Sequence, residues 1–443
     1  MKRVALTDLN EWVSRASRKP LIIRGARQVG KSTLVRMFAK ENSLELFEFN
    51  FEIDKLKTLE REEFDLQALI DEIQIKAKKN LTERSLIFFD EIQESPKLLK
   101  LLRYFYENYP DLKIIAAGSL LEIALKSEEF SFPVGRVEFY HLQPMSFQEF
   151  LWATDNTYLD QKLSNFELTP EVHEAGLLEL RKFFYIGGMP EAVKQYAESK
   201  SLVSIRNIQS QLIQTYEADF PKYNNRIDLN RINRIFSGAA LTLGEKVIFS
   251  KLDSESKSRE VKRVIELLID ARVLSACFHS SSNSTPLFGE VDLSLYKLYF
   301  LDIGLLNSLL NLSVDSLDFD FKDNFKTRGV LAEQFVAQHL NSFNGPQNSP
   351  RLIYHLRDKG VRKAEIDFVI EKEQNVYPVE VKSTAKGHLK SLRYFCETKK
   401  SSLGIKTSLS PFSIDENFVG DSKLVNIPLY AIGYLYQNFD KIN

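Results

Sequence analysis

The feature that most constrains this chain is a glycine-rich segment at residues 25–32. Its residues Gly25-Ala26-Arg27-Gln28-Val29-Gly30-Lys31-Ser32 fit the pattern G-x-x-x-x-G-K-[ST] at every fixed position. The segment follows the apolar run Leu21-Ile22-Ile23 and opens a helix-like stretch at 31–40. A loop between a strand and a helix lets backbone N–H groups surround a phosphate at the positive end of the helix dipole. A glycine-rich turn with an exposed lysine is the plainer alternative, and the strand-loop-helix context argues against it.

The loop predicts a nucleotide site in which each side chain has a role. Lys31 would reach the β- and γ-phosphates of ATP, and the hydroxyl of Ser32 would bind Mg²⁺. The residues of the loop that we expect to hold the nucleotide are Gly25, Ala26, Arg27, Gln28, Val29, Gly30, Lys31, Ser32 and Thr33. ATP and Mg²⁺ are therefore the predicted cofactors.

An Asp-Glu pair follows another strongly apolar run. Leu86-Ile87-Phe88-Phe89 is continuous and ends at Asp90-Glu91. Ligands collect at the carboxyl ends of the strands in a buried parallel sheet, so this pair should lie beside the phosphate loop. Asp90 would bind Mg²⁺ directly or through water, and Glu91 would polarise the attacking water. The alternative is a pair of surface acids that caps a strand.

Apolar strands that alternate with helices predict the fold class. The runs at 21–23, 86–89 and 114–117 are apolar throughout and are separated by helical patterns. This pattern is typical of an α/β fold whose parallel sheet is buried on both faces. We therefore expect a P-loop NTPase sheet. A chain of 443 residues is too long for one hydrophobic core and should form two to four domains.

Composition and charge limit the remaining classes. The net charge of −1 argues against a surface that binds nucleic acid everywhere, but it leaves a local basic face open. With only Cys277 and Cys396 the chain has no disulfide framework, which favours a reducing compartment. No apolar run approaches the ~20 residues needed to cross a bilayer. We expect a cytoplasmic protein without a membrane partner.

Several motifs together resemble a known family. They are Arg-Gly-Ala-Arg-Gln-Val-Gly-Lys-Ser at 24–32, Phe-Phe-Asp-Glu-Ile-Gln at 88–93, Ala-Gly-Ser-Leu-Leu at 117–121, Gly-Arg at 135–136 and Leu-Gln-Pro-Met-Ser-Phe-Gln-Glu-Phe at 142–150. The chain resembles the prokaryotic AAA+-type ATPases that carry a C-terminal domain of unknown function, the AAA_14/DUF4143 family. The likeness covers nearly the whole chain.

That resemblance implies further roles in the nucleotide site. It places the strand that ends at Ser119 between the phosphate-loop strand and the Asp90 strand, with Ser119 as a sensor of the γ-phosphate. Arg136 resembles a phosphate-sensing or finger arginine, although a structural salt bridge would also explain it. Gly188-Met189-Pro190 resembles the Gly-x-Pro of signal-transducing ATPases, in which Pro190 would contact the nucleotide from a helical lid. A simple helix break is the alternative for these residues.

The pattern of elements, together with the resemblance, predicts four domains. They are an AAA+-type ATPase core at 1–155, a helical lid at 156–225, a winged-helix-like region at 226–315 and a PD-(D/E)xK nuclease-like domain at 316–443. The stretch 315–326 is polar and aromatic without periodicity, and we interpret it as a linker.

The pattern of the middle region predicts a helix, a turn, a second helix and a strand. The helical patterns lie at 250–270 and the strand-like run at 296–300, which is the order of a winged helix. The side chains that could contact DNA phosphates are Lys257, Arg259, Lys262 and Arg263. The acids Glu255, Glu260 and Glu266 share this segment and dilute its positive field, so a solvated surface helix is the alternative.

Acids and a lysine coincide in the last third of the chain. Glu333 lies on an amphipathic helix, Asp367 in the strand 366–370, and Glu380 and Lys382 on one face of the strand 379–383. A hairpin tip at 371–375 would pair the two strands and bring Asp367, Glu380 and Lys382 together.

Two carboxylates and a lysine so arranged can hold a divalent ion and activate a water for phosphodiester attack. The set resembles the PD-(D/E)xK nuclease superfamily with Glu333 as the helix acid, although Ile366 rather than proline precedes Asp367. The predicted metal ligands are Glu333, Asp367 and Glu380, and the predicted catalytic residues are Asp367, Glu380 and Lys382. A charged strand pair on a structural remnant of the fold is the alternative.

Together these patterns lead to the hypothesis that the protein is an ATP-hydrolysing enzyme coupled to a DNA-associated, metal-dependent nuclease domain. Residues 351–400 hold twelve Lys/Arg and seven Asp/Glu, an excess that a DNA-binding groove would need and a solvated surface would allow. The rival is a nucleotide-dependent switch or scaffold whose inactive C-terminal domain binds DNA or a protein partner. A regulator that acts through the winged helix alone would leave the phosphate loop without a purpose. Further copies of the chain are another candidate partner.

Overall fold

The structure is a computed structural model of the chain. It describes residues 1–63, 65–125, 135–223, 227–312, 325–341, 345, 351–357, 364–383 and 389–442. The predicted linker at 315–326 lies outside the described residues, except for its last two, which begin a helix. Within the described part no helix combines the length and apolar character needed to span a bilayer.

The N-terminal module is built on a parallel five-stranded sheet of order β2-β3-β4-β1-β5. Its strands are β1 (Leu21–Arg24), β2 (Glu45–Asn50), β3 (Ser85–Asp90), β4 (Lys113–Gly118) and β5 (Glu138–His141). Its helices are α1 (Ala5–Ser14), α2 (Lys31–Glu41), α3 (Leu66–Ala77), α4 (Pro96–Asn108) and α5 (Leu121–Leu125), with short 3-10 turns η1 (Lys57–Glu60) and η2 (Ile92–Glu94).

Strand β3 illustrates why the sequence folds into this sheet. All six of its residues are buried, and alternate side chains enter two different cores, Leu86 and Phe88 on one face and Ile87 and Phe89 on the other. A strand covered by helices on both faces reads as a continuous apolar run. The predicted P-loop NTPase sheet is confirmed, and so is the position of β4 between β1 and β3.

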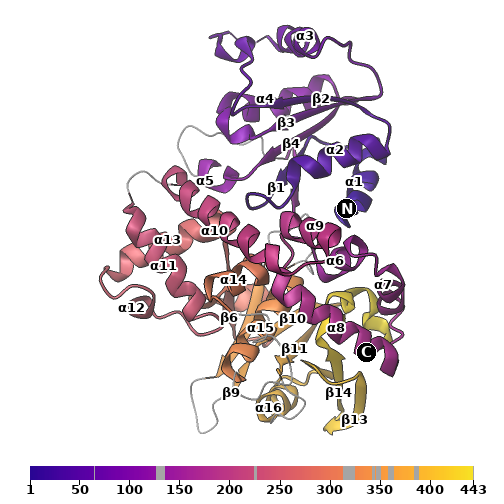
Figure 1. The fold of residues 1–443 in the computed structure, drawn as a ribbon, viewed down its shortest axis with the longest axis vertical. Coiled ribbons are helices and arrows are strands. Elements are labelled where there is room, and N and C mark those ends of the chain that lie inside the picture. Colours follow the sequence, from indigo (N-terminus) through magenta and orange to yellow (C-terminus); the bar gives the residue numbers. More distant parts are fainter. Residues whose placement is uncertain are drawn as a thin grey trace.

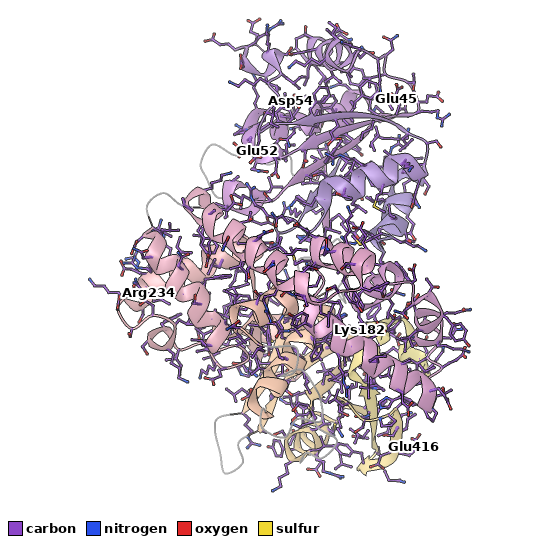
Figure 2. All side chains as sticks on the ribbon, in the orientation of Figure 1. Glu45, Glu52, Asp54, Lys182, Arg234 and Glu416 are labelled. Atoms are coloured by element: carbon purple, nitrogen blue, oxygen red, sulfur yellow. The ribbon has the colours of Figure 1, made fainter. Side chains whose placement is uncertain are left out.

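A helical layer follows the sheet and lies across the middle of the molecule (Figure 1). It contains α6 (Phe147–Ala153), α7 (Thr157–Ser164), α8 (Pro170–Ile186), α9 (Pro190–Ser199) and α10 (Val203–Tyr223). The helices break at Gly187-Gly188-Met189, and Pro190 takes the first position of α9, where a missing N–H costs nothing. Figure 2 shows Glu52 on the side of the sheet module toward this layer, where Lys222 Nζ lies 3.7 Å from its carboxylate.

The middle region has three helices followed by a hairpin. The elements are α11 (Leu229–Leu241), α12 (Phe249–Leu252), α13 (Ser258–Asp270), β6 (Leu274–Ser280), the 3-10 turn η3 (Leu287–Glu290), β7 (Val291–Phe300) and α14 (Ile303–Leu309). Strands β6 and β7 pair antiparallel, and Lys246 forms an isolated bridge to Lys297. The helical patterns predicted at 250–270 correspond to α12 and α13, and the predicted strand 296–300 is the end of the longer β7.

The C-terminal segment contributes to two sheets. Its elements are α15 (Phe325–Leu340), β8 (Leu352–Arg357), β9 (Ala364–Ile366), β10 (Phe368–Lys372), β11 (Asn375–Val381), α16 (Lys390–Lys399), β12 (Leu403–Ser408), β13 (Ser413–Val419), β14 (Ser422–Pro428) and the 3-10 turns η5 (Leu429–Tyr434) and η6 (Tyr436–Lys441). One sheet has the order β10-β11-β12-β14-β13, and the other has the order β7-β6-β8-β9. The second sheet therefore joins strands from both sides of position 315.

One strand prediction is wrong. The sequence predicted a single strand at 366–370, but the chain bends at Asp367. Ile366 pairs with His355 of β8, whereas Phe368 pairs with Val379 of β11, so the chain crosses from one sheet to the other at this residue. The predicted hairpin after it is confirmed, with Glu373 and Gln374 in the left-handed region at its tip.

The C-terminal segment packs against the helical layer. One continuous hydrophobic core runs from one face of the N-terminal sheet through all the later regions. The rings of Phe147 and Phe183 meet the ring of Phe335 edge-on, with centroids 6.2 and 5.8 Å away. The buried ring of His339 accepts a hydrogen bond from the Phe147 N–H through Nε2 at 3.0 Å. Helix α15 is therefore anchored to the start of the helical layer.

Candidate functional site

The phosphate loop joins β1 to α2 in a tight curve. Gly30 has φ 93° and caps α2, a left-handed conformation that glycine adopts without steric cost. Lys31 follows as the first helical residue and is buried, and its ammonium donates to the carbonyls of Gly25 at 3.1 Å and Ala26 at 2.9 Å. Burial lowers the pKa of Lys31 to about 8, although Glu91 and Asp90 nearby oppose that effect. Within the described ranges, no acid forms a direct ion pair with this lysine inside the loop.

The Mg²⁺ ligands predicted from sequence lie together. Ser32 Oγ donates to Asp90 Oδ2 at 2.6 Å, across the gap between the start of α2 and the end of β3. Asp90 is 4% exposed, and its burial raises the pKa of the carboxyl group. A hydroxyl and a carboxylate oxygen are ligands that Mg²⁺ prefers, so this donor pair fits the ion.

Glu91 and Ser119 also meet at the same edge of the sheet. Glu91 adopts the left-handed region at φ 52°, and its Oε2 accepts from Ser119 Oγ at 3.1 Å. Gln93 donates from Nε2 to the same oxygen at 2.7 Å. Gln93 was not anticipated, because nothing in the motif Asp-Glu-Ile-Gln distinguishes an orienting amide from a surface one.

The break between α8 and α9 lies beside the phosphate loop. A Cβ built at Gly30 would lie 3.6 Å from Pro190 Cγ, which places this proline against the loop. The break is held in place, because the Gly188 N–H donates to Asp302 Oδ2 at 2.5 Å and the Gly188 carbonyl accepts from the Met145 N–H at 2.7 Å. The structure thus brings Pro190 to the predicted nucleotide site.

Arg136 is not brought to the loop of its own molecule. It precedes β5, whose first residue Glu138 pairs with Leu21, the first residue of β1, whereas the phosphate loop follows the last residue of β1. Its Nε lies 3.0 Å from Glu107 Oε1 near the end of α4, and its side chain is 45% exposed. The arginine therefore lies at the opposite edge of the sheet, in the salt bridge named as the alternative.

Other contacts of the loop gave no sequence signal. Arg3 donates to the Val29 carbonyl at 2.9 Å and to the Gln143 carbonyl at 2.8 Å, and its Nε lies 2.9 Å from Glu149 Oε1. Arg27 of the loop forms an ion pair with Asp219 of α10. Each arginine has its acid partner, Glu149 or Asp219, more than a hundred residues away in the sequence.

A second group of arginines links the sheet to the middle region. Arg272, two residues after the end of α13, donates to Glu122 Oε1 at 2.8 Å, and Arg24 Nη1 lies 3.9 Å from the same oxygen. Burial lowers the pKa of Arg24 to about 10, while Glu122 opposes that shift. Because Arg24 directly precedes the phosphate loop, this ion pair connects the loop strand to α13.

The predicted C-terminal residues converge as well. Lys382 Nζ donates to Glu380 Oε1 at 2.6 Å, and the Val381 N–H donates to Asp367 Oδ2 at 2.7 Å. Burial, and after it the charge of Asp367, raises the pKa values of both Glu333 and Glu380 to about 8. Bending at Asp367 does not separate these side chains, because Phe368 still pairs with Val379.

Two charged residues that the sequence did not point to join this group. Lys297 of β7 has a side chain only 3% exposed, and its Nζ lies 2.5 Å from Glu365 Oε1. Burial opposes the charge of Lys297, but Glu333, Asp367 and Glu365 together keep its pKa above the usual value. We call Glu333, Glu365, Asp367 and Glu380 the acid cluster.

The acid cluster does not fit a metal ion in this conformation. Among the described residues, no three His, Cys, Asp or Glu side chains are grouped closely enough to hold one. Two lysines contact the cluster instead, Lys297 at Glu365 and Lys382 at Glu380. The second oxygen of Glu380, Oε2, is buried and has no hydrogen-bond partner within the described structure.

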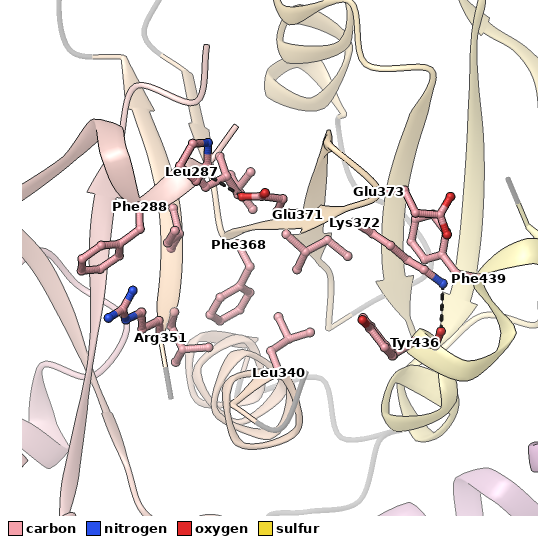
Figure 3. A pocket seen from close by; sticks show the side chains of 15 residues that line it. Leu287, Phe288, Leu340, Arg351, Phe368, Glu371, Lys372, Glu373, Tyr436 and Phe439 are labelled. Carbon is pink, nitrogen blue, oxygen red and sulfur yellow. Dashed lines mark hydrogen bonds between the residues drawn. The ribbon is translucent and has the colours of Figure 1, made fainter. Parts of the chain in front are cut away.

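A separate hollow of about 530 Å³ is lined by Phe368, the residue after Asp367 in the chain (Figure 3). It is enclosed by η3, β8, β10 and η6, and its lining contains no member of the acid cluster. Glu371 accepts from the Leu287 N–H at 2.8 Å on one side, and Lys372 donates to the Tyr436 carbonyl at 3.1 Å on the other (Figure 3). Glu371 and Lys372 are thus engaged by backbone groups of the walls.

Comparison with solved structures gives distant likenesses. Aeropyrum pernix ORC2, in ADPNP–ADP complexes, is 16% identical with a TM-score of 0.36 over 71% of this chain and 91% of that one. The Thermotoga maritima RuvB Holliday junction branch migration motor is 14% identical with a TM-score of 0.30 over 62% of this chain and 89% of that one. No curated protein matches the chain.

Family models cover most of the chain. Residues 17–151 match the AAA domain AAA_14, residues 177–316 match a domain of unknown function, DUF8612, and residues 328–430 match a second, DUF4143. The first match contains the phosphate loop, Asp90-Glu91 and Ser119, and the last contains the whole acid cluster. The chain therefore belongs to the AAA_14/DUF4143 family of P-loop ATPases.

Proposed function

We propose that this protein binds ATP with Mg²⁺ and hydrolyses it at the phosphate loop. The observation that carries the proposal is that Lys31, the Ser32–Asp90 pair and the Glu91–Ser119 pair share one edge of the sheet. Lys31 would exchange its two carbonyl partners for phosphate oxygens, which relieves the cost of burying an unpaired ammonium. Bound Mg²⁺ would neutralise phosphate charge, with Ser32 and Asp90 as its protein ligands.

Glu91 is the proposed general base for the attacking water. Its Oε2 already accepts hydrogen bonds from Gln93 and Ser119, which fixes the direction of the carboxylate. Preorientation of this kind is how a polar side chain gains catalytic effect without reorganising during the reaction. When ATP is present, Ser119 would exchange its bond to Glu91 for one to the γ-phosphate, and Gln93 would continue to orient the Glu91 carboxylate.

The helical layer is the proposed lid. Pro190 lies against Gly30 and Arg27 pairs with Asp219, so α9 and α10 both contact the loop. Nucleotide bound in the loop would therefore change the contacts of the lid, which makes ATP turnover a conformational switch. The exposed Arg136 would reach a nucleotide only in another copy of the chain.

Steady phosphate release tests the first proposal. Purified protein should release phosphate from ATP in Mg²⁺ and stop when the ion is removed with EDTA. Restoring Mg²⁺ should restore the rate. A protein that binds ATP but shows no metal-dependent release would overturn hydrolysis and leave a nucleotide-binding switch.

A second candidate function concerns the acid cluster, and a specific observation favours it. Asp367, at the bend between β9 and β10, comes close to Glu380 and Lys382 at the end of β11, with Glu333 added from α15. We propose that these residues form a DNA-associated, metal-dependent phosphodiesterase site, with the acids as ligands and Lys382 to stabilise developing phosphate charge. The exposed side chains of α13, among them Lys262 and Arg263, would contact the DNA backbone.

A cleavage assay separates this function from its rival, the nucleotide-dependent scaffold. Wild type, Asp367→Ala and Lys382→Ala would be incubated with single-stranded, duplex and branched DNA and with RNA, in Mg²⁺ or Mn²⁺, with and without ATP. Both variants should lose cleavage and keep ATP hydrolysis, whereas Asp415→Ala on the exposed strand β13 should change neither. No cleavage by the wild type under any condition would favour the scaffold.

A further inference from the structure

The middle region covers the acid cluster from one side. Tyr299 Oη donates to Glu333 Oε2 at 3.2 Å, and a Cβ built at Gly244 would lie 2.9 Å from the same oxygen. Two residues before Tyr299 on β7, Lys297 extends its ammonium to Glu365. Residues from outside the C-terminal segment thus supply close contacts to two of the four acids.

The position of Lys297 is fixed by its backbone. Lys297 pairs with Cys277 of β6 and forms the bridge to Lys246. Strand β6 pairs in turn with β8 of the C-terminal segment. Lys297 and Glu365 therefore belong to the same four-stranded sheet, so the ammonium can leave the cluster only if the side chain turns or that sheet opens.

We propose that Lys297 is an internal cation of the acid cluster, whose ammonium takes the place among Glu333, Glu365 and Asp367 that a divalent ion would need. The closed protein consequently has no metal site there, and a divalent ion binds only when Lys297 withdraws. The unpartnered, buried Oε2 of Glu380 is the ligand atom that remains ready for that ion. This inference deepens the proposed phosphodiesterase function, on which it rests for the identity of the ligands.

Charge explains why the lysine and the ion exclude each other. Buried carboxylates need a cation nearby, and either an ammonium or a divalent ion can supply it. Both together would place like charges a few ångströms apart in a poorly solvated site. Lys382 is bound to Glu380 and lies nearer the surface than Lys297, because the Lys382 side chain is 26% exposed. It therefore does not occupy the place that Lys297 fills.

Titration of full-length, nucleotide-free protein with Mn²⁺ tests the inference, with free Mn²⁺ followed by electron paramagnetic resonance. Lys297→Met removes the charge and keeps much of the side-chain volume, and we expect it to bind one Mn²⁺ at least about tenfold more tightly than wild type. Lys297→Arg keeps the charge and should behave as wild type. Adding Asp367→Asn to Lys297→Met should remove the gain. Equal Mn²⁺ affinity of wild type and Lys297→Met would overturn the inference.

Loss of a buried cation could also unfold the protein, so a second variant and a measurement on wild type are included. Lys297→Met with Glu365→Gln removes both members of the ion pair, and it should still bind Mn²⁺ more tightly than wild type, because Glu333, Asp367 and Glu380 remain. In wild type, acylation of Lys297 read by mass spectrometry should be slow beside that of the exposed Lys262. If Mn²⁺ fills an Asp367-dependent site in wild type, the acylation of Lys297 should become faster, because its ammonium has left the cluster. If wild type has no such site, that result also agrees with the inference. Occupancy of that site with Lys297 still protected would overturn it.

The metal readout keeps this inference separate from the cleavage proposal. A Lys297→Met protein that binds Mn²⁺ through Asp367 but cuts no nucleic acid would overturn the phosphodiesterase and leave the internal cation standing. Wild type that cleaves DNA through an Asp367-dependent Mn²⁺ site while Lys297 stays protected would overturn the internal cation and leave the phosphodiesterase standing.

Discussion

Two buried lysines occupy the two candidate sites, and their surroundings are opposite. Lys31 in the phosphate loop donates to backbone carbonyls, and burial lowers its pKa to about 8. Lys297 in the acid cluster meets a carboxylate at 2.5 Å, and nearby acids keep its pKa above the usual value. A buried ammonium without an acid partner gains by binding an anion, whereas one already paired gains nothing. The first site is thus prepared for a ligand, and the second is satisfied without one.

Removing each lysine is the strongest way to break this comparison. Lys31→Ala should weaken ATP binding by about a hundredfold or more, because the charge that meets the β- and γ-phosphates is lost. Lys297→Met should leave ATP affinity unchanged, and so should Lys40→Ala at the exposed end of the same helix α2. Titration calorimetry with a slowly hydrolysed ATP analogue measures all three. Equal losses for Lys31→Ala and Lys297→Met would mean that both act through stability.

Glu91, the proposed general base, should affect ATP turnover rather than ATP binding. Glu91→Gln keeps the shape and one hydrogen-bond acceptor but loses the proton acceptor, so kcat should fall by about a hundredfold while ATP affinity stays near normal. The matched control is Glu94→Gln, an exposed acid three residues later. Steady-state phosphate release gives kcat and KM separately. An unchanged kcat would remove Glu91 from the catalytic role.

The lid contacts sharpen the comparison, because they test whether the lid senses which nucleotide the phosphate loop holds. Pro190→Ala should change the ratio of ATP to ADP affinity by about threefold, because Pro190 lies against Gly30. Pro170→Ala is a control at the same helical position of α8. Arg136→Ala should leave the ratio of an isolated monomer unchanged, since Arg136 lies at the other edge of the sheet. An altered ratio in Pro170→Ala would point to a general loosening of the lid.

The smallest expected effect comes from His339, a buried base that stays neutral in the folded protein and makes stability depend on pH. Burial lowers the pKa of His339 to about 4, whereas the residue should titrate near 6.5 in the unfolded chain. The unfolded state therefore binds the proton first, and stability should fall as pH drops from about 6.5 to 4, by at most about 3 kcal/mol from this residue.

Chemical unfolding at pH 7.5 and pH 5 measures that dependence. His339→Gln can still accept from the Phe147 N–H but cannot be protonated, so it should lose less stability than wild type on acidification. An equal loss in both proteins would assign the acid sensitivity to other groups, such as His141 or His355, whose pKa values burial also lowers to about 4.

The sequence predicted the first site better than the second for a physical reason. Asp90 ends an apolar strand, Ser119 directly follows one, and Lys31 ends the loop after another, and parallel strands bring such ends to one edge. Asp367 and Glu380 were predicted to meet because a hairpin fixes the register of its two strands. Both inferences use local spacing and need no knowledge of distant packing.

Distant packing accounts for what was missed. Lys297 stands in the run Tyr-Lys-Leu-Tyr-Phe of a strand that pairs, through β6, with a segment more than fifty residues later. Nothing around it in the sequence points to an acid partner. The bend at Asp367 was missed for a related reason, since apolar alternation continues unchanged when a chain crosses from one sheet to another.

Helix α15 has a consequence for how this protein can be divided. Its side chains accept three buried backbone N–H groups that lie outside the C-terminal segment, Gln334 from Phe300 at 2.8 Å, Gln338 from Ile303 at 3.0 Å and His339 from Phe147 at 3.0 Å. A fragment that ended before α15 would leave all three donors unsatisfied, at about 1–3 kcal/mol each. The boundary between the DUF8612 and DUF4143 matches is therefore not a place where the chain can be cut into two stable pieces. Recombination that exchanged one half between relatives would have to keep α15 together with the segments that hold these three donors.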